Sequence, residues 1–248
     1  MWGVVGYIGT RDATPIILNG LKRLEYRGYD SAGVAVINGD QLEVRKDAGK
    51  LSQLIDLVEK SPIAGAPGIG HTRWATHGAP NARNAHPHLG QTKRVVVVQN
   101  GIVENFLELK DELTAEGVEF QSETDTETIV HLVEHYLATG IGLVEAARKT
   151  FNQIRGANVV VLISADEPDK IVTARIGNAG GVVIGMGEGE NFVASDTPAI
   201  MDHTRNVIFL ESRQMAVVTR DTVTIETIDG AKVKPQVHNV SCDPVAAE

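Results

Sequence analysis

Four short stretches of this sequence carry more polar and charged side chains than a buried strand or a plain turn needs. They are LEYRGYDSAG (24–33), GHTRWATHG (70–78) with NAHPH (84–88), QNGIVEN (99–105) and SETDTE (122–127). Amide, guanidinium and carboxylate groups of this kind can hold a polar substrate and stabilise charge that develops during a reaction. Each stretch also has a structural explanation on its own: an Arg27–Asp30 ion pair, a turn at Gly101, or a capping box at 122–127.

The histidines raise the alternative of a metal site. His71, His77, His86 and His88 lie within 18 residues, and imidazole is a common zinc ligand. Their spacing does not match HExxH, and glycines and prolines separate them. A single cysteine, Cys242, excludes an internal disulfide framework and a cysteine-rich zinc site. We therefore expect no metal at these residues.

Composition excludes several classes of protein. The chain has 248 residues, a net charge of −9 and 42% hydrophobic residues, without a run of Lys and Arg. An acidic chain of this kind is a poor candidate for binding nucleic acid or anionic membranes. The longest apolar runs are far shorter than the roughly 20 residues of a membrane span, and no secretion signal is recognisable. These features predict a cytoplasmic protein without a membrane partner.

Hydrophobic periodicity predicts an α+β fold. Helices are expected at 13–28, 50–60, 104–117, 126–140 and 142–156. Strands are expected at 3–9, 31–37, 41–46, 66–71, 94–98, 158–165, 170–177, 181–187, 191–196, 205–212, 214–220 and 222–228. The strand at 94–98 is predicted to end in a tight turn at Gln99–Gly101. The arrangement favours two sheets between two helix layers in one domain (1–240), with 241–248 as a tail or truncated linker.

The four polar stretches together resemble one family. In their residues and their order, seven motifs are similar to the N-terminal glutamine amidotransferase domain of glutamine–fructose-6-phosphate aminotransferases. They are GVVGYIG, LEYRGYDSAG, HTRWATHG, NAHPH, NGIVEN, SETDTE and GENFVASD. The resemblance covers nearly the whole chain and implies a four-layer αββα sandwich of the N-terminal-nucleophile hydrolase type. It further implies glutamine as the substrate, no cofactor, and a parent enzyme, homo-oligomeric, with a sugar-isomerase domain that this chain lacks.

The resemblance also assigns roles to residues. It implies that Asn100 and the backbone N–H of Gly101 form an oxyanion hole. It implies that Arg73 binds the glutamine α-carboxylate and that Asp125 accepts a hydrogen bond from the substrate ammonium. The remaining implied roles are lining of the pocket by Thr76 and His77, closure or gating of the site by Trp74, and support of the first strand by Arg27. A guanidinium fork matches a carboxylate, and donors aimed at a developing negative charge stabilise it.

The sequence departs from the family at the nucleophile. The family uses a cysteine exposed by removal of the initiator methionine, and its free amine serves as the base; this sequence has Trp2 at that position. An indole cannot form the thioester, and a large second residue predicts that Met1 stays attached. Cys242, in a polar tail, offers no substitute. Smaller departures are Gln99, where many relatives have histidine, and 178–181, where a serine–proline pair is common.

Three interpretations of the departure stay open. The chain is a glutaminase domain impaired or inactive in hydrolysis; or a non-catalytic module that binds glutamine or docks to a synthase partner; or an ordinary glutaminase in which residue 2 is engineered or erroneous. Assay of glutamate release separates the first from the third, and calorimetry with glutamine separates the two forms of the second.

Overall fold

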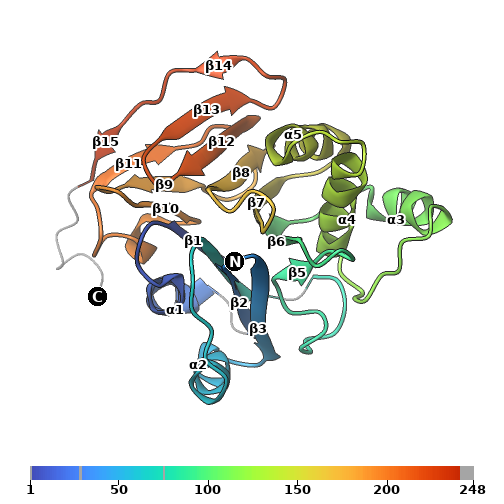
Figure 1. The fold of residues 1–248 in the computed structure, drawn as a ribbon, viewed down its shortest axis with the longest axis horizontal. Helices are drawn as coiled ribbons and strands as arrows, with labels where there is room; N and C mark the ends of the chain where they lie inside the picture. The colour runs from blue at the N-terminus through green and yellow to red at the C-terminus, as the bar shows by residue number, and fades with distance from the viewer. Residues whose placement is uncertain (1, 28–29, 75, 241–248) are drawn as a thin grey trace.

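Two antiparallel sheets lie face to face in the computed structural model, which describes residues 2–27, 30–74 and 76–240 (Figure 1). Within these residues the first sheet has the order β15 (His238–Asn239), β11 (Asn206–Phe209), β9 (Val183–Met186), β10 (Asn191–Ala194), β1 (Gly3–Ile8), β4 (Gly68–Arg73), β2 (Ser31–Asn38) and β3 (Gln41–Ala48). The second has the order β14 (Lys232–Val233), β13 (Val223–Thr227), β12 (Gln214–Thr219), β8 (Lys170–Ile176), β7 (Asn158–Ser164), β6 (Val95–Gly101) and β5 (His88–Leu89).

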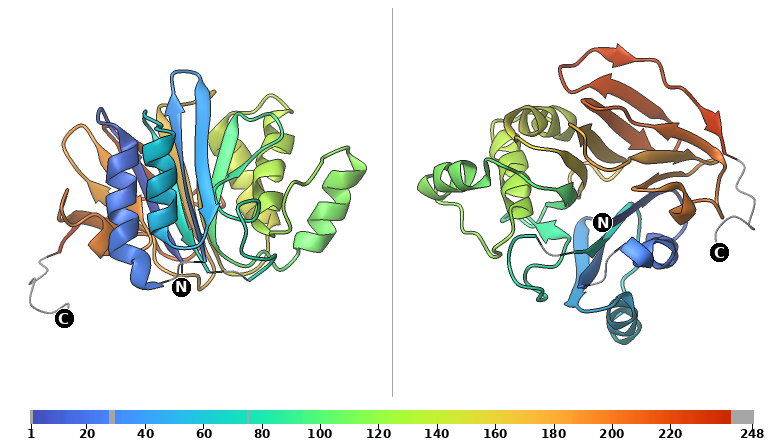
Figure 2. Two further views of the ribbon diagram at one scale, coloured as in Figure 1. Left: turned by 90° about the horizontal axis from the view of Figure 1, so that it is seen from below. Right: turned by 180° about the vertical axis from the view of Figure 1, so that it is seen from behind.

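Helices cover the outer face of each sheet. The first sheet is covered by α1 (Ala13–Leu24) and α2 (Leu51–Lys60), and the second by α4 (Thr126–Leu137) and α5 (Leu143–Gln153), with α3 (Phe106–Ala115) outside α4. The short 3₁₀ helices η1 (Glu25–Arg27) and η2 (Thr197–Ala199) complete the elements named here. Figure 2 shows the two helix layers on opposite sides of the paired sheets. The predicted αββα sandwich is therefore confirmed.

Three apolar layers explain why the strands are apolar on both faces. In β1, Val4 belongs to the core between the sheets, whereas Val5 packs toward α1. In β6, Val96 and Val97 divide in the same way between the central core and the core under α4. Successive side chains of a strand point to opposite faces, so a sheet covered on both sides needs continuous apolar runs.

The predicted turn at Gln99–Gly101 is wrong. Strand β6 continues through these residues and pairs with β7, with Asn100 opposite Val159 and Gly101 opposite Asn158. Backbone pairing with a neighbouring strand decides where a strand ends, and that partner lies far along the chain. The extension places Asn100 and Gly101 at the end of a rigid strand.

The starts of α1 and α4 are held by different contacts. Asp12 caps α1 by accepting from the backbone N–H of Thr14 at 3.1 Å. The capping box at 122–127 does not form, because Glu127 reaches back past Thr124 to the N–H groups of Gln121 and Ser122. The predicted tail 241–248 with Cys242 lies outside the described residues. Within the described part of the chain, no helix is long and apolar enough to cross a bilayer.

Candidate functional site

The beginning of the chain meets the end of β6. The side-chain amide nitrogen Nδ2 of Asn100 donates to the backbone carbonyl of Trp2 at 3.3 Å. The indole N–H of Trp2 in turn donates to the backbone carbonyl of Trp74, which follows β4. Strand β1 pairs with β4 in one sheet, and β6 lies in the other. Trp2, Trp74 and Asn100, which the sequence predicted to share a site, are therefore together.

A cavity of about 370 Å³ opens beside this meeting point. It is lined by Trp2, Asn100, Gly101, Ile102, Glu104, Ala157, Asn178, Ala179, Gly180, Gly181 and Ser195. The sequence marks 178–181 only as a departure from the family, and it marks Ser195 only as part of the GENFVASD motif, without a role in the site. Small residues with little functional chemistry carry no signal for a site, so only the folded arrangement identifies them as its wall.

Arg73 is buried at the end of β4, with 3% of its surface exposed. Its Nη2 donates to the backbone carbonyl of His77 and, at 3.4 Å, to that of Gly78. Its Nη1 is buried and has no hydrogen-bond partner among the described residues. A buried guanidinium with an unsatisfied donor is costly to maintain, and an acceptor on a bound ligand would satisfy that donor.

Asp125, which immediately precedes α4, faces the same segment. One carboxylate oxygen accepts from the backbone N–H of Val103 at 2.7 Å, and the other lies 3.8 Å from Nδ1 of His77. Burial raises the pKa of Asp125, although the Val103 N–H opposes that shift. His77 thus touches Arg73 through its carbonyl and faces Asp125 through its ring. Thr76 lies beside it, with Oγ1 at 3.4 Å from His77 Nδ1.

The structure brings together most of the predicted site residues. They form two adjoining groups: Trp2, Trp74, Asn100 and Gly101 in one, and Arg73, Thr76, His77 and Asp125 in the other. Trp74 is 56% exposed. The backbone of Arg27 ends η1, and its side chain lies outside the described part of the structure.

A buried residue that the sequence did not assign to the site links its parts. The Gln99 side-chain carbonyl accepts from the hydroxyl of Thr126 at 2.8 Å, and its amide nitrogen donates to Asn158 Oδ1 at 2.6 Å. Gln99 therefore ties β6 to α4 on one side and to β7 on the other. Its position next to Asn100 was the available signal, but a single glutamine does not reveal its partners.

The clustered histidines lie in the same interior. His71 stacks on His86 with ring centroids 4.2 Å apart, and His86 meets His88 edge-on at 4.8 Å. Burial is the first cause that lowers the pKa of all three imidazoles, so they are neutral. Searched over residues 2–27, 30–74 and 76–240, the structure has no group of three or more His, Cys, Asp or Glu side chains placed to hold a metal ion.

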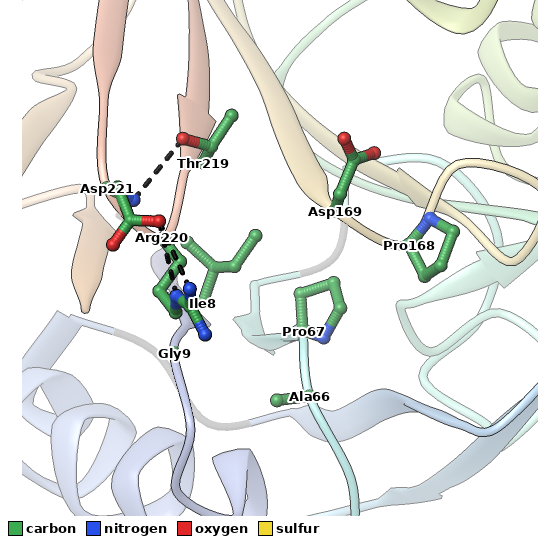
Figure 3. Close-up of a pocket in the computed structure, with 9 residues that line it drawn as sticks. All are labelled: Ile8, Gly9, Ala66, Pro67, Pro168, Asp169, Thr219, Arg220 and Asp221. Carbon is green, nitrogen blue, oxygen red and sulfur yellow. Dashed lines mark hydrogen bonds and ion pairs between the residues drawn. The ribbon is translucent and has the colours of Figure 1, made fainter. Parts of the chain in front are cut away.

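A second cavity, of about 410 Å³, lies at the opposite end of β1 (Figure 3). Its wall includes Ile8 and Gly9, about 20 Å along the strand from Trp2. Of its charged residues, Arg220 pairs with the adjacent Asp221 at 3.3 Å. Trp74, Arg73, Asn100 and Asp125, which the sequence singles out for chemistry, lie at the Trp2 end, which is the candidate site.

Comparison with known proteins identifies the family. Residues 71–202, more than half of the chain, match the family model of the glutamine amidotransferase domain. The chain belongs to this family. The match begins at His71 and includes Arg73, Asn100 and Asp125, so the amidotransferase domain model spans most of the candidate site.

Curated relatives of the amidotransferase domain are longer proteins. The chain is 48% identical over 248 residues to the glutamine–fructose-6-phosphate aminotransferase (isomerizing) of Caldanaerobacter subterraneus, covering all of this chain and 40% of that protein. It is 49% identical over 242 residues to the enzyme of the same name from Thermococcus kodakarensis, covering 97% of this chain and 40% of that protein. The chain thus spans well under half the length of these relatives.

A solved structure agrees with the fold. The glutamine phosphoribosylpyrophosphate amidotransferase of B. subtilis superposes with a TM-score of 0.79 at 26% identity, covering 91% of this chain and 49% of that one. The paired-sheet architecture of the amidotransferase domain is thus shared with an enzyme whose sequence differs at most positions.

Proposed function

We propose that this amidotransferase domain binds glutamine and is impaired or inactive in hydrolysing it, because Trp2 occupies the position of the nucleophile. One observation carries the proposal: the main chain of Trp2 lies 3.3 Å from Nδ2 of Asn100, and Trp2 shares a cavity with Asn100 and Gly101. This contact supports our assignment of position 2 to the reacting group.

Hydrolysis of a side-chain amide by this route needs a nucleophile that adds to the carbonyl carbon and forms a tetrahedral oxyanion. Asn100 Nδ2 and the Gly101 N–H are the donors we assign to that oxyanion. Trp2 supplies neither a thiol nor a hydroxyl, and its indole N–H is already donated to the carbonyl of Trp74. The covalent step has no starting group on this residue.

Recognition of glutamine is assigned to the neighbouring charges. The α-carboxylate would accept from Nη1 of Arg73, which has no partner in the described part of the chain, and would replace the carbonyl of His77 as the acceptor from Nη2. The α-ammonium would face the carboxylate of Asp125, whose second oxygen is held by Val103. Because the pKa of Asp125 is raised by burial, we expect glutamine affinity to fall as acid protonates this group.

The wider context rests on the relatives. Since the chain spans about 40% of their length, we propose that a sugar-isomerase domain would accompany it in a homo-oligomeric parent enzyme that makes amino sugars. The boundary of the domain at residue 240, a cytoplasmic location, the gating role of Trp74 and the supporting role of Arg27 are predictions of the same kind.

Glutamate release from glutamine tests the proposal. We expect no release above the blank from the purified chain, and release from Trp2→Cys once intact mass shows that its first residue has been removed. Trp2→Ala is the matched control, because it removes the indole without supplying a thiol. Release by the unaltered chain at the rate of Trp2→Cys would overturn the hydrolytic half and favour an ordinary glutaminase.

Calorimetry tests the binding half. Nη1 of Arg73 is buried and has no hydrogen-bond partner among residues 2–27, 30–74 and 76–240, and this favours a domain that takes an anionic ligand over one that only docks to a partner. We expect heat of binding with L-glutamine and none with D-glutamine, whose α-groups exchange places. Absence of heat with either would leave docking as the remaining role.

A further inference from the structure

His71 lies directly behind the side-chain amide of Asn100. It is fully buried in β4, and its Nε2 lies 2.9 Å from Oδ1 of Asn100 and 3.1 Å from the backbone carbonyl of Gln99. Both neighbours are carbonyl oxygens, which only accept hydrogen bonds. The proton of this imidazole is therefore on Nε2.

The other ring nitrogen has no such neighbour. Nδ1 of His71 is buried without a hydrogen-bond partner among the described residues. Burial lowers the pKa of His71 to about 3; the hydrogen bond to Asn100 opposes this shift and the charge of Arg73 adds to it. The stacked ring of His86 is neutral as well. His71 is thus a neutral imidazole in one tautomer, with one donor and a fixed direction.

A single donor in this place selects one of two orientations of the Asn100 amide. With Oδ1 toward His71, the amide nitrogen points toward the carbonyl of Trp2 and the candidate site. Rotation of the amide by half a turn would set N–H against N–H at His71 and direct an oxygen toward the site. That orientation loses a buried hydrogen bond and replaces the donor for an oxyanion with a repulsive acceptor.

We propose that His71 is a positioning residue that holds the Asn100 amide with its nitrogen directed into the site. The consequence for turnover rests on the proposed function, in which Asn100 stabilises the oxyanion; the orientation itself does not. His71 touches Asn100 and makes its contribution through it, so its removal should resemble removal of the Asn100 amide.

The orientation is tested first on the unaltered chain. Nitrogen-15 NMR of the histidine-labelled protein should show His71 protonated at Nε2 and unprotonated at Nδ1, without titration between pH 5 and pH 8, consistent with its lowered pKa. A proton on Nδ1, or a cationic ring in this range, would overturn the proposal.

Turnover is tested in the Trp2→Cys background. His71→Leu should lower kcat on the order of 100-fold, as loss of one oxyanion donor does, with little change in KM. In combination with Asn100→Ala it should cost no more than Asn100→Ala alone. His71→Gln retains a donor and should recover most of the loss. The matched control is His88→Leu, a second buried neutral imidazole, which binds Thr124 and does not contact Asn100.

The remaining outcomes are decisive in either direction. Equal loss in His71→Gln and His71→Leu, or full additivity with Asn100→Ala, would show a merely structural role and overturn the proposal. If His71→Leu does not fold, His71→Gln and the NMR measurement decide. If Trp2→Cys itself shows no turnover, the catalytic part of the proposed function fails, while a protonated Nε2 in the unaltered chain still supports the positioning role of His71.

Discussion

Asn100 Nδ2 donates to the backbone carbonyl of Trp2 at 3.3 Å, across 98 positions of the sequence. Asn100 lies in β6 of one sheet and Trp2 directly precedes β1 of the other, so this hydrogen bond joins the two layers of the sandwich at one corner. Because the site is assembled from both sheets, a change in the packing between them alters its geometry as directly as a change in a side chain of the site.

Replacement of Arg73 by lysine should weaken glutamine binding at least tenfold, which is about 1.4 kcal/mol. A lysine ammonium cannot present two parallel donors to a carboxylate. The substitution also removes the guanidinium nitrogen that donates to the carbonyl of His77. Calorimetry with L-glutamine measures the effect. Arg155→Lys, at a side chain that is 72% exposed, is the control and should bind as the unaltered chain does.

Gln99→Leu should lower the free energy of unfolding by roughly 2–4 kcal/mol. The substitution leaves the carbonyl oxygen of Asn158 without the donor that Gln99 supplies, and it removes an acceptor from the Thr126 hydroxyl. Urea denaturation followed by circular dichroism measures the change. Gln53→Leu, on the exposed face of α2, should shift the midpoint little; equal shifts would show that the Gln99 bridge contributes nothing.

Gly101→Ala should destabilise the fold and displace the Asn100 amide. Gly101 has φ of +134°, and a Cβ there would lie 2.1 Å from the carbonyl oxygen of Ala157, so β6 and the segment before β7 cannot keep their positions. We expect a loss of at least about 2 kcal/mol on thermal or urea unfolding. Gly140→Ala, at φ of +86° with nothing within 4 Å, separates the steric clash from the backbone conformation and should cost less.

Glu127 makes the stability dependent on acid. Burial raises the pKa of Glu127, but hydrogen bonds from His131, Gln121 and Ser122 outweigh burial and lower the pKa from 4.5 to about 2. A carboxyl with a lower pKa in the folded state contributes stability above its unfolded pKa, and this is lost as pH falls from about 4.5 to about 2. The contribution is about 3 kcal/mol at neutral pH.

Glu127→Gln should therefore be less stable than the unaltered chain near pH 6, and the difference should shrink as pH approaches the folded-state pKa of about 2. Urea denaturation at a series of pH values measures this. Glu59→Gln, on the exposed side of α2, should follow the unaltered chain at every pH. A difference for Glu127→Gln that stays constant with pH would contradict the assigned shift.

Local pattern was sufficient for most elements of the fold. The apolar spacing of 13–28 predicts α1, and the strands predicted at 31–37 and 41–46 are β2 and β3, which pair with each other. Two-residue strands such as β5 are not predicted from the sequence, because a pair of residues has no periodicity to detect. The end of β6 is not predicted for another reason: its last residues are held by pairing with β7, some 60 positions later in the sequence.

The sequence by itself determined which chemical groups this protein possesses: a guanidinium at position 73, an amide at 100, a carboxylate at 125, and an indole at position 2. Side-chain chemistry is local and is fully specified by residue type. Only the tertiary structure decided their directions, because hydrogen bonds between distant strands orient them: His71 turns the Asn100 amide toward Trp2, and His77 lies between Arg73 and Asp125.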